Sequence, residues 1–479
     1  MSFDNELKEK VLVYDGSKGF LLMQQGLAPG EIPDMWNLTF PDVVFDIHKA
    51  YIDAGADVLQ TNTLQASRYH LEARGLYEKQ ADINRAGVGL AKKAAGQNAF
   101  VAASVGPLGT LMAPFGETSF AEAYSAFSEQ IGMLFEAGAQ ILHFETFTDL
   151  SELRIAVLAA RDICRDAPLI ATISLEPNGR TVMGDDAMCA AASLAMLGVC
   201  CFGANCGLPP IGMLDKFEPF TAFNGPLCSK PNAGTPIVTD GIIKYGATED
   251  EFYDTTFGFA RLGARLIGGC CGSGPSHINS IRKAADIINI DDAYNYSSII
   301  KGVSGQDDTV MLCSHNRVAY LAKSALLECS VGTLPRTPGK TASDNNMPVF
   351  CESNDGSLLT VDLSGLLRCD SVDSDKIIEI LSDSNESDAE ATIFSLLTSG
   401  CRAHDGNVSG CDASAFFGCI ASNSRVYHNK PIVFHTDDTA AMNAALTQYC
   451  GAPAILVAKA EAGSFCESIS RFTTTVIQY

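Results

Sequence analysis

Two adjacent cysteines and a third one upstream are the residues of this chain whose types and spacing point most directly to chemistry. Cys270 and Cys271 lie between glycines, directly after a short apolar run that ends at Ile267, and Cys206 closes another apolar run. If both runs are β-strands, their ends hold three thiols at rigid positions with little bulk around them. Three protein thiolates with an open fourth position are typical of a catalytic zinc site.

Two other interpretations of these cysteines stay open at this point. The chain holds 17 cysteines, and most of them must be small buried hydrophobic residues. An adjacent pair such as Cys270 and Cys271 can also close a strained vicinal disulfide. The C-x-x-C spacing that marks many zinc sites is absent. The elements that would bring the three sulfurs together therefore decide between these interpretations.

The composition of the chain limits the classes of protein to which it can belong. Its 479 residues are 47% hydrophobic, which suits two or three domains with at least one large core. The sequence contains no run of about 18 apolar residues, so no membrane span is expected. Residues 1–8 also lack an apolar signal core. Together with the odd number of cysteines, this favours the reducing cytoplasm and free or metal-bound thiols. A net charge of −23 argues against nucleic acids and anionic membranes as partners.

A unit of one short apolar strand followed by a helical stretch recurs from residue 11 to about residue 290. Helical periodicity between the strands is clear in residues 41–54, 119–137 and 150–161. Eight such units predict a closed (β/α)8 TIM barrel. An open, doubly wound sheet is the alternative, and the lack of G-x-G-x-x-G after the first strand disfavours its dinucleotide-binding form. The predicted strands are 11–15, 57–63, 100–105, 141–146, 169–174, 199–204, 222–228 and 264–268.

Polar residues and thiols follow most of these strands. Each has a plain structural interpretation by itself: Asp15 and Gly16 suit a turn, and Glu145 suits a helix cap. In a barrel, however, the carboxyl ends of all strands meet at one face, where active sites lie. The joint placement of these residues therefore predicts a functional ring. Its members are Asp15, Gly16, Thr61, Asn62, Thr63, Glu145, Thr146, Asn205, Cys206, residues 229–232, Cys270 and Cys271.

Residues 8–290 resemble the homocysteine S-methyltransferase family, which includes the N-terminal barrel of cobalamin-dependent methionine synthase. The resemblance is carried above all by the Gly-Gly-Cys-Cys-Gly element at 268–272 and the Asn-Cys pair at 205–206. Further motifs are Asp-Gly-Ser-Lys-Gly at 15–19, Trp-Asn-Leu-Thr-Phe-Pro-Asp-Val-Val at 36–44, Tyr-Ile-Asp-Ala-Gly-Ala-Asp at 51–57, Gln-Thr-Asn-Thr at 60–63, Phe-Glu-Thr at 144–146 and Pro-Asn-Ala-Gly at 231–234.

The resemblance implies a role for each matched position. Cys206, Cys270 and Cys271 are implied as the ligands of one Zn²⁺ per chain. The residues implied to hold the amino acid part of homocysteine are Asp15, Gly16, Thr61 and Glu145. Asn232 is implied to lie beside the metal, where it takes the fourth position in the metal-free site. The chain departs from the family mildly, with Lys18 in a segment where many members have Ala-Met-Gly-Thr and Gln60 where many have Glu.

The activity implied is methyl transfer to the thiol of homocysteine, which forms methionine. A thiol is mostly protonated at neutral pH, and zinc coordination deprotonates it. We expect Glu145 to attract the substrate ammonium and backbone groups near Gly16 to orient its carboxylate. The favoured methyl donor is a methylated corrinoid protein carrying methylcobalamin, because the sequence after residue 300 looks like a degraded pterin-binding domain. No cobalamin-binding Asp-x-His-x-x-Gly loop is present, so we expect the corrinoid to be supplied in trans on another protein. Alternatives are S-methylmethionine or betaine as donor, a thiol acceptor other than homocysteine, and a non-catalytic barrel that senses thiols or metals.

The chain after residue 300 changes in character, so we place a domain boundary there: residues 1–300 form the barrel and 301–479 a smaller α/β domain. Residues 302–308 suit a linker, 333–348 a loop and 370–390 an acidic surface around a short helix. Residues 309–327 suggest a strand and a helix. We then expect helices at 389–399 and 439–449 and strands at 431–434 and 454–458.

This second domain weakly resembles the opening part of a pterin-binding barrel, through Asp-Gly-Asn at 405–407 and Pro-Ile-Val-Phe-His at 431–435. His435 stands where that family has a pterin-holding aspartate, the Gly-Glu-Arg-Thr-Asn opening is absent, and the sequence given ends too soon for eight strands. We therefore expect a domain that docks a partner or closes a homodimer rather than one that binds folate.

Overall fold

The structure is a computed structural model, and it describes residues 2–289 except 224, 240 and 241. Beyond residue 289 it describes separate stretches, which are 309–313, 318–322, 349–352, 358–362, 374–387, 389, 391–396, 413–428, 430–436, 438–449, 454–457 and 475–478. The chain divides into two compact units that change over near residue 296. The predicted boundary at residue 300, the linker at 302–308, the loop at 333–348 and the motif at 405–407 all lie outside the described residues.

Eight parallel strands form the sheet of the first unit. Neighbours in this sheet follow the order β1-β10-β7-β6-β5-β4-β3-β2, and a parallel bridge between Tyr14 and Val58 joins its two ends. The sheet is therefore a closed ring, and the predicted (β/α)8 barrel is confirmed. The strands are β1 (Leu12–Val13), β2 (Val58–Gln60), β3 (Phe100–Val105), β4 (Ile141–Phe147), β5 (Leu169–Ile173), β6 (Cys201–Asn205), β7 (Leu227–Lys230) and β10 (Ala264–Ile267).

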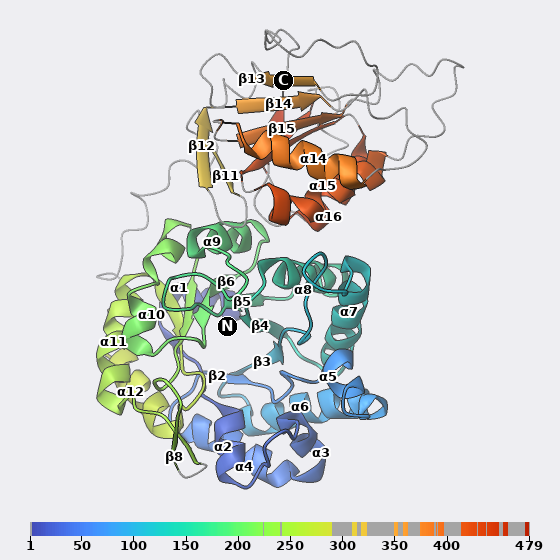
Figure 1. Cartoon of the computed structure of the whole chain (residues 1–479). Helices are drawn as coiled ribbons and strands as arrows, with labels where there is room; N and C mark the ends of the chain where they lie inside the picture. The colour runs from blue at the N-terminus through green and yellow to red at the C-terminus, as the bar shows by residue number, and fades with distance from the viewer. Residues whose placement is uncertain are drawn as a thin grey trace. The chain divides into compact units, whose positions relative to one another are not determined.

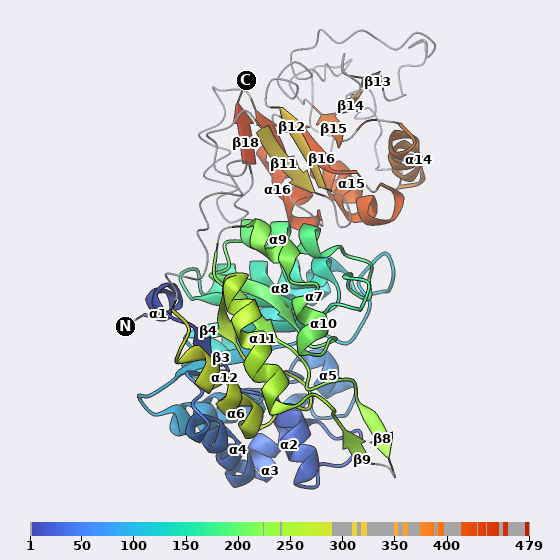
Figure 2. The ribbon, with the colours of Figure 1, turned by 90° about the vertical axis from the view of Figure 1, so that its left-hand side faces the viewer.

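Helices surround this ring on its outer side (Figures 1 and 2). Helix α7 shows why the sequence folds this way: Ser119 and Glu122 form a capping box at its start, and Ala123, Phe127 and Ile131 repeat at four-residue intervals and are buried. The helices are α1 (Phe3–Glu9), α2 (Lys18–Gln24), α3 (Trp36–Thr39), α4 (Pro41–Asp53), α5 (Arg68–Glu72), α6 (Gln80–Ala95), α7 (Phe120–Glu136), α8 (Leu150–Ile163), α9 (Ala187–Met196), α10 (Pro210–Leu214), α11 (Glu249–Arg261) and α12 (Pro275–Ala285).

Helix α1 contributes to the core inside the barrel. Its Phe3 and Leu7 belong to one buried cluster with strand residues such as Leu12, Val58 and Leu266. Leu12 and Val58 are the first residues of β1 and β2, so the end of the barrel at which these strands begin is filled with apolar side chains. The carboxyl ends remain available for polar residues, as in other barrels of this type.

Strand β7 is the one barrel strand that we predicted in the wrong place. Residues 222–228 were expected as a strand, whereas Glu218–Ala222 form a 3-10 helix and the strand runs from Leu227 to Lys230. Pro226 has no amide hydrogen to donate, so pairing with both neighbouring strands starts after it. The hairpin of β8 (Ile237–Thr239) and β9 (Ile242–Lys244) follows and extends from the barrel in Figure 2.

The second unit is also of the α/β type in its described parts. Strands β14 (Leu358–Asp362), β15 (Ala391–Leu396), β16 (Ile432–Thr436), β17 (Ala454–Val457) and β18 (Thr475–Gln478) lie side by side and parallel, and β13 (Val349–Glu352) pairs antiparallel with β14. Its helices are α14 (Ser374–Asn385), α15 (Ala413–Tyr427) and α16 (Thr439–Gln448).

Two local predictions for this unit were wrong. Residues 391–396, predicted within a helix, form strand β15, because a short apolar run with β-branched residues fits the centre of a parallel sheet. The helix expected within 309–327 is replaced, where described, by a hairpin of β11 (Thr309–Cys313) and β12 (Val318–Ala322). Within the described part of the chain, no helix has the length and apolar character that crossing a membrane requires.

Candidate metal centre and substrate pocket

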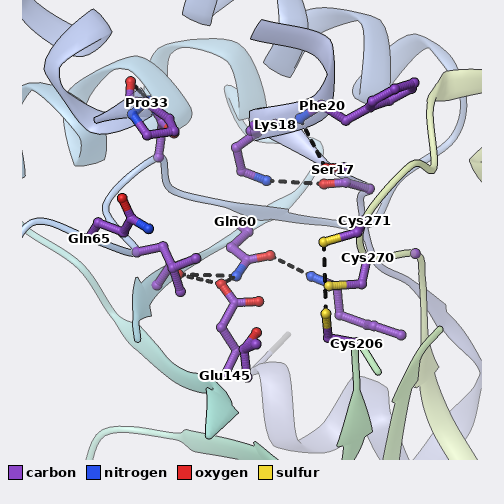
Figure 3. Close-up of a pocket in the computed structure, with 18 of the residues that line it drawn as sticks. Ser17, Lys18, Phe20, Pro33, Gln60, Gln65, Glu145, Cys206, Cys270 and Cys271 are labelled. Carbon is purple, nitrogen blue, oxygen red and sulfur yellow. Dashed lines mark hydrogen bonds between the residues drawn. The ribbon is translucent and has the colours of Figure 1, made fainter. Parts of the chain in front are cut away.

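Three cysteine sulfurs meet at the carboxyl ends of the barrel strands. Cys206 follows β6, while Cys270 and Cys271 follow β10. The three Sγ atoms lie within 4.8 Å of one another, and those of Cys206 and Cys271 are 3.8 Å apart. Figure 3 shows them together on one wall of a cavity. In the described part of the chain, this is the only group of three histidine, cysteine or acidic residues close enough to hold a metal ion.

The end of strand β7, which lies between β6 and β10, holds both cysteine loops in place. The Cys206 N–H donates to the carbonyl oxygen of Lys230 at 3.0 Å, and the Cys270 N–H donates to that of Pro231 at 2.8 Å. The Cys271 N–H donates to Oδ1 of Asn232 at 3.1 Å. Asn232, predicted beside the metal, uses its side-chain oxygen to anchor the loop of Cys271.

Backbone conformation at this site is unusual. Cys206 has φ +61°, a left-handed conformation that costs a residue with a side chain of the order of 1 kcal/mol. Gly272 has φ +79°, and a Cβ atom there would lie 2.1 Å from the ring of Tyr245. The glycine after the cysteine pair is therefore required by both its conformation and this aromatic ring.

The three thiols share protons unequally. Hydrogen bonds from Cys270 and Cys271 lower the pKa of Cys206 to about 3. The same contacts raise the pKa of Cys271, and the contact with Cys206 contributes most to raising the pKa of Cys270 to about 12. Each thiol therefore affects the ionisation of the other two, as expected of ligands that one cation would deprotonate together.

A chain of polar contacts forms another wall of the cavity, with Gln60 and Glu145 at its centre (Figure 3). Nζ of Lys230 on β7 donates to Oε1 of Gln60, and Nε2 of Gln60 donates to Oε1 of Glu145 on β4. The same Glu145 oxygen accepts from the hydroxyl of Ser104. Burial raises the pKa of Glu145, against the opposing effect of Lys230. A carboxylate that is 6% exposed thus borders the cavity, held in place by residues of β2 and β3.

Asp15 lies next to this chain of contacts and is fully buried. Its Oδ2 accepts from Nζ of Lys18 at 2.8 Å and from the N–H of Gln60 at 2.9 Å, while its Oδ1 lies 3.8 Å from Nζ of Lys230. Two buried lysines therefore flank one buried aspartate. Burial lowers the pKa of Lys18, and Asp15 opposes this effect.

The cavity between these walls has a volume of about 240 Å³. Gly16, Thr61, Glu145 and the three cysteines line it, as do 16 other residues. Asp15 and Asn232, although predicted as substrate-binding residues, are not among the residues that line it. They lie behind residues that do, as partners of Lys18 and of Cys271.

Comparison with known proteins shows the family to which the chain belongs. The sequence profile of a family described as homocysteine S-methyltransferase matches residues 12–285, which is more than half of the chain. The chain belongs to the homocysteine S-methyltransferase family. The predicted family is therefore confirmed.

Two curated relatives of this family member are named methionine synthase. The protein of Mycobacterium tuberculosis is 31% identical over 303 residues, which cover 59% of this chain and 25% of that protein. The protein of Mycobacterium leprae is 31% identical over 297 residues, which cover 58% of this chain and 24% of that protein. The chain thus matches about a quarter of the length of these curated relatives.

A solved structure shares the fold of the barrel. The metallated form of the homocysteine methyltransferase MmuM from Escherichia coli superposes with a TM-score of 0.50, at 24% identity, over 58% of this chain and 96% of that one. At this identity the likeness supports the barrel fold of the family and nothing finer.

Lys230 belongs to the predicted ring, through residues 229–232, and lines the cavity, but no role was predicted for its side chain. A buried lysine could be recognised only from its partners on other strands. Lys18 and Gln60, noted as departures from the family, both line the cavity and both contact Asp15. Tyr245 and Phe20 were missed; their rings pack edge to face at 5.3 Å beside the sulfurs.

Proposed function

We propose that the barrel transfers a methyl group to the thiol of homocysteine and forms methionine, with one Zn²⁺ held by Cys206, Cys270 and Cys271. The observation that carries this proposal is the meeting of three sulfurs with a buried carboxylate across one small cavity. The family to which the chain belongs supports the choice of reaction. Because the curated relatives are far longer, the activity of the whole protein is part of the proposal.

The sulfur geometry fits a tetrahedral zinc ion. A Zn–S distance of about 2.3 Å places two sulfurs of a regular tetrahedron about 3.8 Å apart. The sulfurs of Cys206 and Cys271 lie 3.8 Å apart already, and Cys270 lies within 4.8 Å of both. When bound, zinc would deprotonate a thiol placed at its fourth position and keep it nucleophilic.

The residues of the chain would bind and orient the substrate. Glu145 supplies a negative charge for the substrate ammonium, and the loop at Gly16 supplies backbone groups for its carboxylate. Thr61 is already held by two contacts: its hydroxyl accepts from the Ser104 N–H and lies 2.6 Å from that of Thr63. Such fixed neighbours position the substrate with little further ordering. In the reaction the S–H bond is lost, an S–CH₃ bond forms, and the bond between donor and methyl breaks.

We propose a methylated corrinoid protein, supplied in trans, as the methyl donor. A cavity of about 240 Å³ suits a small amino acid and is smaller than the usual range of about 300–1,000 Å³ for larger ligands. A corrinoid would have to present its methyl group at the opening. Betaine would favour an aromatic cage, and the aromatic residues that line this cavity are Phe20 and Tyr245. S-methylmethionine and betaine remain the alternative donors.

The second unit, residues 301–479 in our division, is proposed to dock a partner or close a homodimer. Its described strands form a mostly parallel α/β sheet, which is compatible with part of a pterin-type barrel and assigns no ligand. The cytoplasm is the proposed compartment, because many cysteine side chains of the described part are free.

The decisive experiment is an activity screen of the zinc-loaded full chain with homocysteine and each of three donors: methylcobalamin, S-methylmethionine and betaine. Methionine formed with methylcobalamin supports the corrinoid donor, and methionine formed with another donor replaces that part of the proposal. If none of the donors gives methionine while the metal content is intact, a thiol- or metal-sensing barrel becomes the better explanation. A Cys271→Ala variant, which should lose metal, is the negative control.

A further inference from the structure

The side-chain amide of Asn205 lies beneath the cavity and contacts both halves of the site. It is fully buried and belongs to the end of strand β6. Its Oδ1 accepts from the Thr146 N–H at 2.7 Å and from the Thr172 hydroxyl at 2.7 Å. Its Nδ2 donates to Oγ1 of Thr146 at 2.8 Å and to Sγ of Cys270 at 3.6 Å.

These contacts fix the orientation of the amide. The Thr146 N–H can only donate, so it must face the oxygen of Asn205, and the nitrogen must then face the sulfur. An amide oxygen accepts two hydrogen bonds and an amide nitrogen donates two, so all four possibilities of Asn205 are used. No water or other partner is needed to satisfy this buried group, and the sulfur of Cys270 receives a hydrogen bond of defined origin.

The backbone on both sides of this amide is strained. Among the non-glycine residues that the structure describes, Thr146 and Cys206 alone have positive φ, +63° and +61°. Thr146 directly follows Glu145, and Cys206 directly follows Asn205. Such conformations persist where surrounding contacts over-determine them, and they gather at functional sites. Asn205 supplies such contacts, because it binds the N–H and the hydroxyl of Thr146 and one of the neighbouring sulfurs.

We propose that Asn205 is a positioning residue that tunes the sulfur of Cys270 through an N–H···S hydrogen bond and couples it to the peptide after Glu145. The inference rests on the metal-binding part of the proposed function. A hydrogen bond to a thiolate draws electron density away from sulfur, and outer hydrogen bonds of this kind orient and tune metal ligands. Asn205 makes no contact with the cavity itself, so it acts through Cys270 and Thr146.

The test uses the full chain loaded with Co²⁺, whose sulfur-to-metal charge-transfer band reports the electron density on the thiolate ligands. Asn205→Asp keeps an oxygen for the Thr146 N–H and for Thr172 but places a carboxylate oxygen against the sulfur. The band should move to lower energy. Thr172→Val is the matched control, because it removes a hydrogen bond to the same amide without touching the sulfur. Its band should stay where the unaltered protein has it.

A second variant keeps the test decisive if Asn205→Asp does not fold. Asn205→Ser is too short to reach the sulfur and adds no charge, so the band should move in the same direction by a smaller amount. A folded variant of Asn205 with an unchanged band, or a control that shifts as far as Asn205→Asp, would overturn the inference. If the unaltered protein shows no thiolate-to-cobalt band, the proposed metal centre fails instead, so the two failures are distinguishable.

Discussion

Replacing Glu145 by glutamine is the sharpest test of how the pocket selects its substrate. The change is nearly isosteric, and a glutamine oxygen can still accept from Ser104 and from Gln60, as Glu145 does. What it removes is the negative charge that faces the cavity. The variant therefore isolates the proposed contact with the ammonium group of homocysteine.

The expected size of the effect follows from the burial of this carboxylate, which is 6% exposed. Hydrogen bonds to charged groups contribute about 1.5–3 kcal/mol, which corresponds to an affinity loss of about 10- to 150-fold. The raised pKa of Glu145 adds a pH dependence. As the pH falls through that raised pKa, the carboxylate gains a proton and loses its attraction for the ammonium, so binding to the unaltered protein weakens. Binding to the variant should lack this dependence.

Calorimetric titration with L-homocysteine and with 4-mercaptobutanoate, which lacks the amino group, gives the necessary comparison. The variant should lose affinity for homocysteine but bind 4-mercaptobutanoate as the unaltered protein does. An equal loss for both ligands would mean that Glu145 only shapes the pocket, and no loss for either would refute its assignment to the substrate ammonium.

Three further outcomes are expected. Cys271→Ser should lower bound zinc well below one ion per chain by elemental analysis, whereas Cys164→Ser, which alters a buried thiol bonded to a helix carbonyl, should not. Asp34→Asn should stabilise the protein at neutral pH. Burial raises the pKa of Asp34 from 3.8 to about 7, so the folded state keeps a proton that the unfolded chain releases, and the free energy of unfolding falls by up to about 4 kcal/mol as the pH rises through that range. Urea denaturation at pH 4 and pH 7.5 should show the variant's advantage only at the higher pH, and a constant difference would contradict this. Lys230→Met should lower the free energy of unfolding by about 3 kcal/mol, because it leaves the buried Asp15 with one cation fewer. An unchanged midpoint of urea denaturation would show that the pair of Lys230 and Asp15 contributes nothing to stability.

The barrel could be predicted from the sequence because its strands are buried on both faces and their apolar runs end at glycines or polar residues. Strand β3 was placed at its observed bounds, Phe100–Val105. The same kind of evidence, a short apolar run, led us to predict a helix where the structure has strand β15. Five of its six residues are apolar or β-branched, and such a short run has no period that separates a buried strand from a helix. Only pairing with its neighbours β14 and β16 decides between the two.

The candidate site was predictable where one residue type implies one chemistry. Three cysteines at strand ends were placed together in advance, and the sulfurs do meet. The polar wall was harder, because the position of a buried charge depends on partners from several strands. Lys230 lies in the barrel interior with Nζ 3.8 Å from the centre of the Tyr14 ring. Nothing in the local sequence predicts this contact. Asp15 was expected to contact the substrate, whereas the structure places it behind Lys18, which lines the cavity.

The left-handed backbone at Cys206 lowers the stability of the fold, whereas the proposed chemistry needs the sulfur of this residue. Glycine adopts this conformation without penalty, so a chain selected for durability alone would place glycine there. Serine or alanine would keep the penalty and lose the sulfur. Replacing Cys206 by glycine would therefore relieve the backbone penalty and remove one of the three sulfurs in the same step, so stability would rise as the sulfur group is lost.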